Sequence, residues 1–183
     1  MSNNTFLENY YNDYDEEGRL ENRIGKVEYL TTRRYIDSLL TADCKIAEIG
    51  AGTGRYSVTL AKEGYDVTAV ELVQHNLDIL RSKLNGSENI RTHIGNALDL
   101  NMLKDNTFDI TLLLGPMYHL YSDEDKLTAL KEAVRITKQG GYILVAYCMN
   151  EATVIQYVFG CDKLKSIMEL NMLTDGRRRI RFG

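Results

Sequence analysis

Short apolar runs alternate with segments in which apolar residues recur every three or four positions. The runs are near-continuously apolar, as expected for strands buried on both faces, and they span residues 45–50, 66–72, 89–95, 108–115 and 142–149. The segments with helical spacing span residues 20–41, 55–63, 73–84 and 122–139. Strands that alternate with amphipathic helices are typical of an α/β fold whose parallel sheet is covered on both faces. The pattern therefore predicts a three-layer α/β open sheet.

Turn and capping residues support these boundaries. Gly64 is expected to end the second helix. Ser122 and Asp125 form a capping-box pattern at the start of the last helix, which Gly140–Gly141 is expected to end. The length of 183 residues suits a single domain over 1–183.

Composition narrows the class of protein. A hydrophobic content of 44% and a net charge of −4 are ordinary for a globular protein and give no reason to expect a nucleic-acid partner. Cys44, Cys148 and Cys161 are far apart, which favours a reducing compartment and excludes a CxxC metal pair. No run approaches the roughly 20 apolar residues that cross a bilayer, and the N-terminus has no signal-peptide core. We therefore expect a cytoplasmic protein with no membrane partner and no metal.

The candidate site begins where the first strand turns into the second helix, in the stretch "EIGAGTGRYSV". Glycines at this position permit a tight turn and a close ligand, and ligands of open sheets bind at the carboxyl ends of the strands. A dinucleotide fingerprint G-x-G-x-x-G would need a third glycine at Arg55, whose side chain would crowd the helix. Glu71 ends the second strand, where a carboxylate can accept both hydrogen bonds of a ribose diol. These residues favour a nucleoside site over a nicotinamide dinucleotide site.

These motifs resemble those of the class I S-adenosylmethionine-dependent methyltransferases, whose glycine loop reads E/D-x-G-x-G-x-G. Further resemblances are "GNAL" at 95–98, "FDITLLLGPMYHL" and "ITKQGGYILVAY", so the likeness covers about residues 10–149. The resemblance implies a Rossmann-like sheet with strand order 3-2-1-4-5, S-adenosylmethionine as cofactor and methyl transfer to an acceptor. It implies a cofactor site made of Glu48, Gly50, Ala51, Gly52, Thr53, Gly54, Glu71, Leu72, Asn96, Ala97, Leu114 and Gly115.

The loop after the fourth strand is the expected substrate side. His119 is the best candidate base and Tyr118 lies beside it, although a histidine that only packs locally is the alternative. The loop reads Gly115-Pro116-Met117-Tyr118 and lacks the Asp or Asn with which similar enzymes grip an amide or base. A small-molecule acceptor is therefore expected.

Both ends of the chain carry further predictions. Residues 1–42 are expected to form a helical N-terminal lid, in which Tyr11, Tyr14 and Arg19 contact the cofactor; a mobile acidic tail is the alternative. Residues 43–149 form the expected core and 150–183 a short or truncated tail, with one further helix at 164–173. The fifth strand would then be an apolar edge that the tail or a second subunit covers, which makes a homodimer an option.

Two other functions remain open from the sequence. One is an NAD-dependent oxidoreductase, and the other is a non-catalytic module that binds S-adenosylmethionine or another nucleoside.

Overall fold

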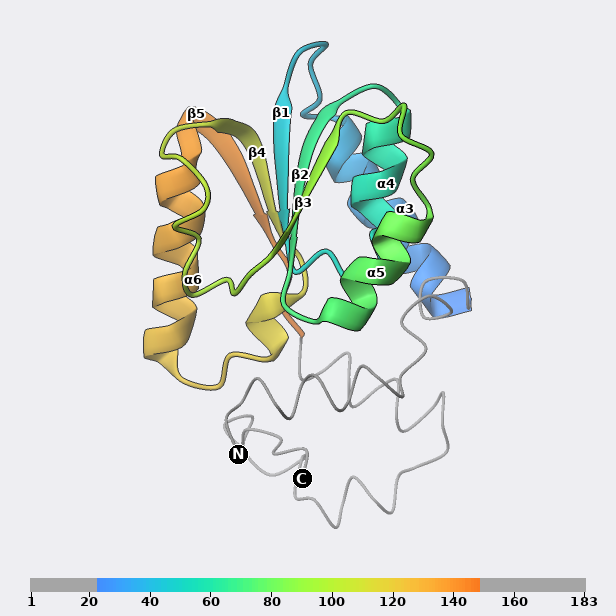
Figure 1. Cartoon of the computed structure of the whole chain (residues 1–183). Helices are drawn as coiled ribbons and strands as arrows, with labels where there is room; N and C mark the ends of the chain where they lie inside the picture. Colours follow the sequence, from blue (N-terminus) through green and yellow to red (C-terminus); the bar gives the residue numbers. More distant parts are fainter. Residues whose placement is uncertain (1–22, 149–183) are drawn as a thin grey trace, which may run out of the picture. The chain divides into compact units, whose positions relative to one another are not determined.

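The computed structural model describes residues 23–148, in which five parallel strands form one sheet in the order β3-β2-β1-β4-β5 (Figure 1). The strands are β1 (Lys45–Ile49), β2 (Asp66–Glu71), β3 (Ile90–Ile94), β4 (Phe108–Leu113) and β5 (Thr137–Val145). The helices are α3 (Arg23–Asp37), α4 (Arg55–Lys62), α5 (Gln74–Ser82), α6 (Asp123–Ile136) and the short 3₁₀ helix η1 (Pro116–Tyr118). The predicted fold class and strand order are confirmed.

The chain divides into two compact units, residues 1–146 and 147–183, and the first contains every element named above. The predicted lid residues Tyr11, Tyr14 and Arg19 and the predicted helix at 164–173 lie outside the described residues. No described helix combines the length and the apolar composition needed to cross a bilayer.

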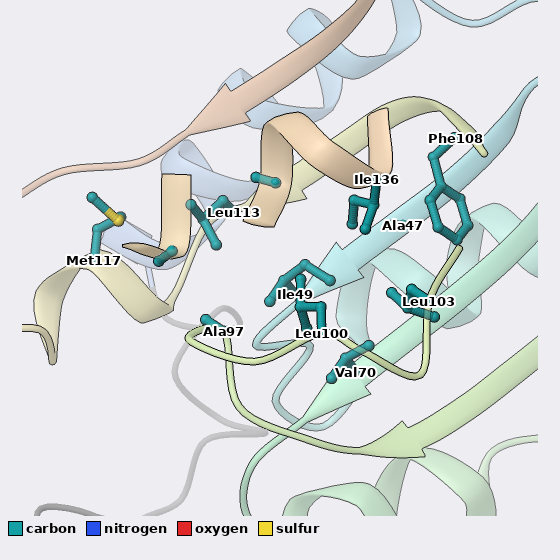
Figure 2. Close-up of a cluster of buried hydrophobic side chains, with 12 residues drawn as sticks. Ala47, Ile49, Val70, Ala97, Leu100, Leu103, Phe108, Leu113, Met117 and Ile136 are labelled. Carbon is teal, nitrogen blue, oxygen red and sulfur yellow. The ribbon is translucent and has the colours of Figure 1, made fainter. Parts of the chain in front are cut away.

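The helices form a layer on each side of the sheet. Helix α6 lies on one face, and α3, α4 and α5 lie on the other (Figure 1). Strand β1 shows how the alternation of side chains serves both layers. Ala47 and Ile49 join the cluster that packs under α6 (Figure 2), whereas Ile46 joins the cluster under α3 and α4. Both clusters are closed by residues fully removed from water, such as Ile36 and Ile136.

One predicted boundary is wrong: helix α6 ends at Ile136, and Gly140–Gly141 lies inside β5. The carbonyl groups of Arg135 and Ile136 accept hydrogen bonds from the loop before β4, which closes the helix early. The pairing register then jumps from Phe108–Thr137 to Ile110–Tyr142, so residues 138–141 bulge opposite a single residue of β4.

The glycine pair serves this bulge. Gly140 has a φ of 81°, and a Cβ on Gly141 would lie 2.8 Å from the carbonyl oxygen of Asp109. The glycines therefore allow the close approach of two strands, and a pattern of residue types alone does not distinguish this from a helix stop.

Candidate functional site

The carboxyl ends of β1, β2 and β4 lie side by side because these strands are parallel neighbours in the sheet. The glycine loop, residues 50–54, leaves β1 at this edge and leads into α4. Its three glycines have φ values of 74°, 55° and 84°, in the left-handed region that only glycine adopts without strain. The amides of Gly50 and Ala51 donate to the carbonyl of Val70 at 2.8 and 3.1 Å, which fixes the loop to the end of β2.

At two of the loop glycines, neighbouring atoms also leave no room for a side chain. A Cβ on Gly50 would lie 2.7 Å from Cδ of Pro116, in the loop that follows β4. A Cβ on Gly54 would lie 2.5 Å from Cγ of Leu80 on α5. The predicted loop thus contacts both flanking segments, and no larger residue fits at either position.

Glu71 joins the glycine loop to the start of α5. Its side chain is 6% exposed, and its Oε2 accepts a hydrogen bond from the Gly52 amide at 2.8 Å. Its Oε1 accepts from the Val73 amide at 2.9 Å. The predicted ribose acid therefore lies directly at the glycine loop, with its carboxylate held by two backbone donors.

Glu48 has a different environment from Glu71. Its carboxylate is 2% exposed and accepts hydrogen bonds from both the amide and the hydroxyl of Ser57, in the first turn of α4. Burial, and to a smaller degree the charge of Glu71, raises the pKa of Glu48 to about 7, although the hydrogen bonds from Ser57 act in the opposite direction. These contacts couple β1 to α4 across the glycine loop.

The third predicted segment of the site follows β3. The Gly95 amide donates to the carbonyl of Glu71 at 2.9 Å and thereby extends the pairing with β2. Asn96 accepts from the Leu98 amide at 3.0 Å, which makes a local turn, and Ala97 is buried. Leu72, directly after Glu71, is half-buried. The structure therefore brings the 95–98 segment to the strand end that carries Glu71.

The predicted substrate loop starts with Leu114 and Gly115 and continues as η1. A Cβ on Gly115 would lie 3.2 Å from the carbonyl oxygen of Gly50, so this loop closely contacts the glycine loop. The rings of Tyr118 and His119 meet edge to face, with centroids 6.2 Å apart. Burial lowers the pKa of His119, which keeps its imidazole neutral at neutral pH.

The structure revises the role expected for Arg55. Its guanidinium lies over the ring of Tyr29 on α3, 5.0 Å from the centroid, so its side chain does not crowd the sheet. The glycine loop packs closely against a helix one residue earlier, where Gly54 meets Leu80 of α5. The argument from Arg55 against a dinucleotide therefore loses its steric basis, while the residue still departs from the fingerprint.

Asn76 of α5 and Lys83, the C-cap residue directly after α5, contribute to this region although no motif marks them. Lys83 Nζ donates to the carbonyl of Thr53 at 2.7 Å, and Thr53 is buried. Asn76 lies in the first turn of α5, which follows Glu71, and is 2% exposed. Helical spacing alone predicts that Asn76 and Lys83 share one face of the helix. It does not predict that this face lies against the glycine loop. Among the described residues, no group of three or more His, Cys, Asp or Glu side chains could hold a metal ion.

Comparison with known proteins identifies the family to which the chain is similar and known structures with the same fold. Residues 47–145 match the family described as a methyltransferase domain. A demethylmenaquinone methyltransferase of Staphylococcus aureus is 29% identical over 144 residues, which cover 75% of this chain and 56% of that protein. The chain thus spans little more than half the length of the curated relatives it matches.

Solved structures show the same architecture. A methyltransferase from Thermotoga maritima, described as a possible histamine N-methyltransferase, matches with a TM-score of 0.59 and 26% identity over 90% of this chain and 77% of that chain. A phosphoethanolamine N-methyltransferase of Haemonchus contortus, solved with phosphoethanolamine and S-adenosylhomocysteine, matches with a TM-score of 0.63 and 26% identity over 78% of this chain and 30% of that chain.

Proposed function

The chain belongs to the methyltransferase-domain family, which its residues 47–145 match, and we propose that it transfers a methyl group from S-adenosylmethionine to a small-molecule acceptor. The observation that carries this proposal is the contact between Glu71 and the glycine loop. It joins a buried carboxylate to a turn that holds three left-handed glycines. Such a site suits a nucleoside whose ribose hydroxyls need acceptors and whose other atoms need a close backbone.

The residues present fit this cofactor. The glycine loop offers a backbone without side chains, and Glu71 supplies acceptor oxygens at the loop's edge. Asn96 and Ala97 follow β3 at the same edge of the sheet, where they would border the adenine. We assign the nucleoside end to Glu71, Leu72, Asn96 and Ala97, and the methionine end to the glycine loop with Leu114 and Gly115.

Catalysis in this proposal depends mainly on alignment. When bound, S-adenosylmethionine supplies an activated methyl group. The chain must hold the acceptor in line and exclude water, and a base is needed only if the acceptor arrives protonated. His119 would accept that proton because burial, which lowers its pKa, keeps the imidazole in the neutral form that has a free lone pair. Tyr118 packs against His119 and would help to orient it.

Two observations support a small-molecule acceptor. The loop after β4 reads Gly115-Pro116-Met117-Tyr118 and has no Asp or Asn to grip a base or a side-chain amide. Two of the similar proteins are named for small acceptors, demethylmenaquinone and phosphoethanolamine. The acceptor of this chain belongs to the same broad class in our proposal.

Thermal unfolding with candidate cofactors tests the proposal directly. S-adenosylhomocysteine and S-adenosylmethionine should raise the unfolding midpoint, because a ligand that binds only the native state stabilises it. NAD should have no effect. Stabilisation by NAD alone would overturn the assignment in favour of an oxidoreductase.

Glu71→Gln tests the residue on which the assignment depends. The substitution removes the charge and one acceptor oxygen, so affinity for S-adenosylhomocysteine should fall about tenfold to a hundredfold. Titration calorimetry measures the loss. Asp78→Asn is the matched control, because this carboxylate lies on the exposed side of α5. Equal affinity in wild type and Glu71→Gln would remove the ribose assignment.

A further inference from the structure

Asn76 is a buried amide in the first turn of α5 whose oxygen has no partner among residues 23–148. The residue is 2% exposed, and its Oδ1 has no hydrogen bond within the part of the chain that the structure describes. Arg33 and Glu88 also contain a buried atom of this kind, but their side chains make other hydrogen bonds. Oδ1 is the only acceptor of the Asn76 side chain.

The position of Asn76 follows from Leu80 of α5 and from Lys83, the C-cap residue that directly follows α5. Leu80 occupies the space beside Gly54, where a Cβ would come within 2.5 Å. Lys83 Nζ reaches the carbonyl of Thr53 at 2.7 Å. Positions i, i+4 and i+7 share one helix face, so Asn76 lies on the face of α5 that is turned to the glycine loop.

Along that face, Asn76 is the residue nearest the start of α5. The helix begins directly after Val73, whose amide donates to Glu71 at 2.9 Å. Glu71 in turn accepts from the Gly52 amide at 2.8 Å. Asn76 is therefore at the end of α5 where the acid and the glycine loop meet.

Leaving such an oxygen buried without a donor destabilises the native state, and an apolar residue of the same shape would avoid this cost. We propose that Asn76 is a further nucleoside-binding residue, whose amide oxygen accepts a hydrogen bond from a ribose hydroxyl of the cofactor beside Glu71. This inference rests on the proposed cofactor. A neutral amide suits the position, because a second carboxylate would repel Glu71.

Asn76→Leu is the sharpest test, since leucine has a similar volume and no polar atom. Without ligand, the variant should unfold a few degrees above wild type, because the unpartnered oxygen is gone. Its affinity for S-adenosylhomocysteine, measured by titration calorimetry, should fall about tenfold, the equivalent of one lost hydrogen bond. His75→Leu, on the exposed side of the same turn, is the control and should bind as wild type does.

Analogues identify the contacted group. With 2′-deoxy or 3′-deoxy S-adenosylhomocysteine, the tenfold difference between wild type and Asn76→Leu should disappear for the analogue that lacks the contacted hydroxyl. If the difference persists with both analogues, the ribose contact is wrong. Should Asn76→Leu not fold, Asn76→Ala provides the same comparison.

The outcomes separate this inference from the proposed function. If wild type binds S-adenosylhomocysteine and Asn76→Leu binds equally well, the inference fails and the proposed function stands. If wild type does not bind S-adenosylhomocysteine, the proposed function fails and the inference fails with it.

Discussion

At the scale of single residues, Glu48 and Glu71 show how the neighbouring hydrogen-bond donors give two acids of one site different roles. Both were predicted to bind the cofactor. Glu71 is held by the glycine loop and by the start of α5. Glu48 is instead held by α4, where Ser57 supplies two donors. The contacts of Glu48 suit a residue that positions the loop, and its predicted contact with the cofactor stays a prediction.

The raised pKa of Glu48 predicts a pH dependence of stability. Its ordinary pKa is 4.5, and burial raises the pKa to about 7 in the native state. Between these values the native state binds more protons than the unfolded state, so the free energy of unfolding falls as pH rises from about 4.5 to about 7. One pKa unit corresponds to about 1.4 kcal/mol, so the loss is of the order of 3 kcal/mol.

Glu48→Gln isolates this contribution, because glutamine resembles the protonated acid and does not titrate. The variant should lose less stability than wild type across that interval and should be the more stable of the two at pH 8. Urea unfolding at pH 5, 6, 7 and 8 measures both curves. Parallel curves for the two proteins would show that Glu48 does not titrate in this range.

At the scale of elements, Gly54 determines how closely α5 approaches the glycine loop. Its φ of 84° is strained for other residues, and a Cβ would overlap Leu80. The sequence predicts a glycine turn here, and the packing of α5 adds a second reason why the third glycine cannot be larger.

Gly54→Ala should therefore destabilise the protein by about 2–4 kcal/mol, from backbone strain and overpacking together. Gly64→Ala is the matched control. It has a φ of 100° but no atom within 4 Å of a Cβ, so only the strain of about 1–2 kcal/mol applies.

Chemical denaturation of both variants gives the comparison. Gly54→Ala should also be less damaging when combined with Leu80→Ala than the sum of the two changes, because the smaller residue leaves room for the new methyl group. Additive effects, or equal losses for Gly54→Ala and Gly64→Ala, would argue against the contact with Leu80.

At the scale of the whole molecule, β5 forms one end of the sheet within the described residues. The Ala146 amide donates to Leu113 of β4, so alternation directs the amides of Ile143 and Val145 away from β4. The sequence predicts that the tail or a second subunit covers this edge, because an open apolar edge favours aggregation. That cover, including a homodimer, stays a prediction.

Hydrogen exchange of the full chain tests whether the outer edge of β5 is covered. If the edge is covered, the amides of Ile143 and Val145 should exchange as slowly as we expect for the amide of Ala146, which is bonded to β4. Light scattering then separates a dimer from a monomer covered by its own chain. Fast exchange at Ile143 and Val145 with slow exchange at Ala146 would mean an open edge and would contradict the prediction.

The residues that form the fold and the centre of the site could be predicted from local patterns. Buried strands, amphipathic helices and the loop glycines have characteristic sequences, because period and backbone conformation are properties of neighbouring residues. The helix 55–63, for example, was predicted to within one residue of α4. The end of α6 was missed, because Gly140–Gly141 also suits the bulge that pairing with β4 imposes.

The sequence by itself determined the α/β class, the strand order through its resemblance, and the positions of the glycine loop and Glu71. Only the tertiary structure decided that Glu48 bonds to Ser57, that Arg55 lies over Tyr29, and that Asn76 is buried with no hydrogen bond to its oxygen from the described residues. The physical reason is that these contacts join side chains of separate elements or orient a helix face. Their partners are chosen by packing across the sheet, which no local spacing encodes.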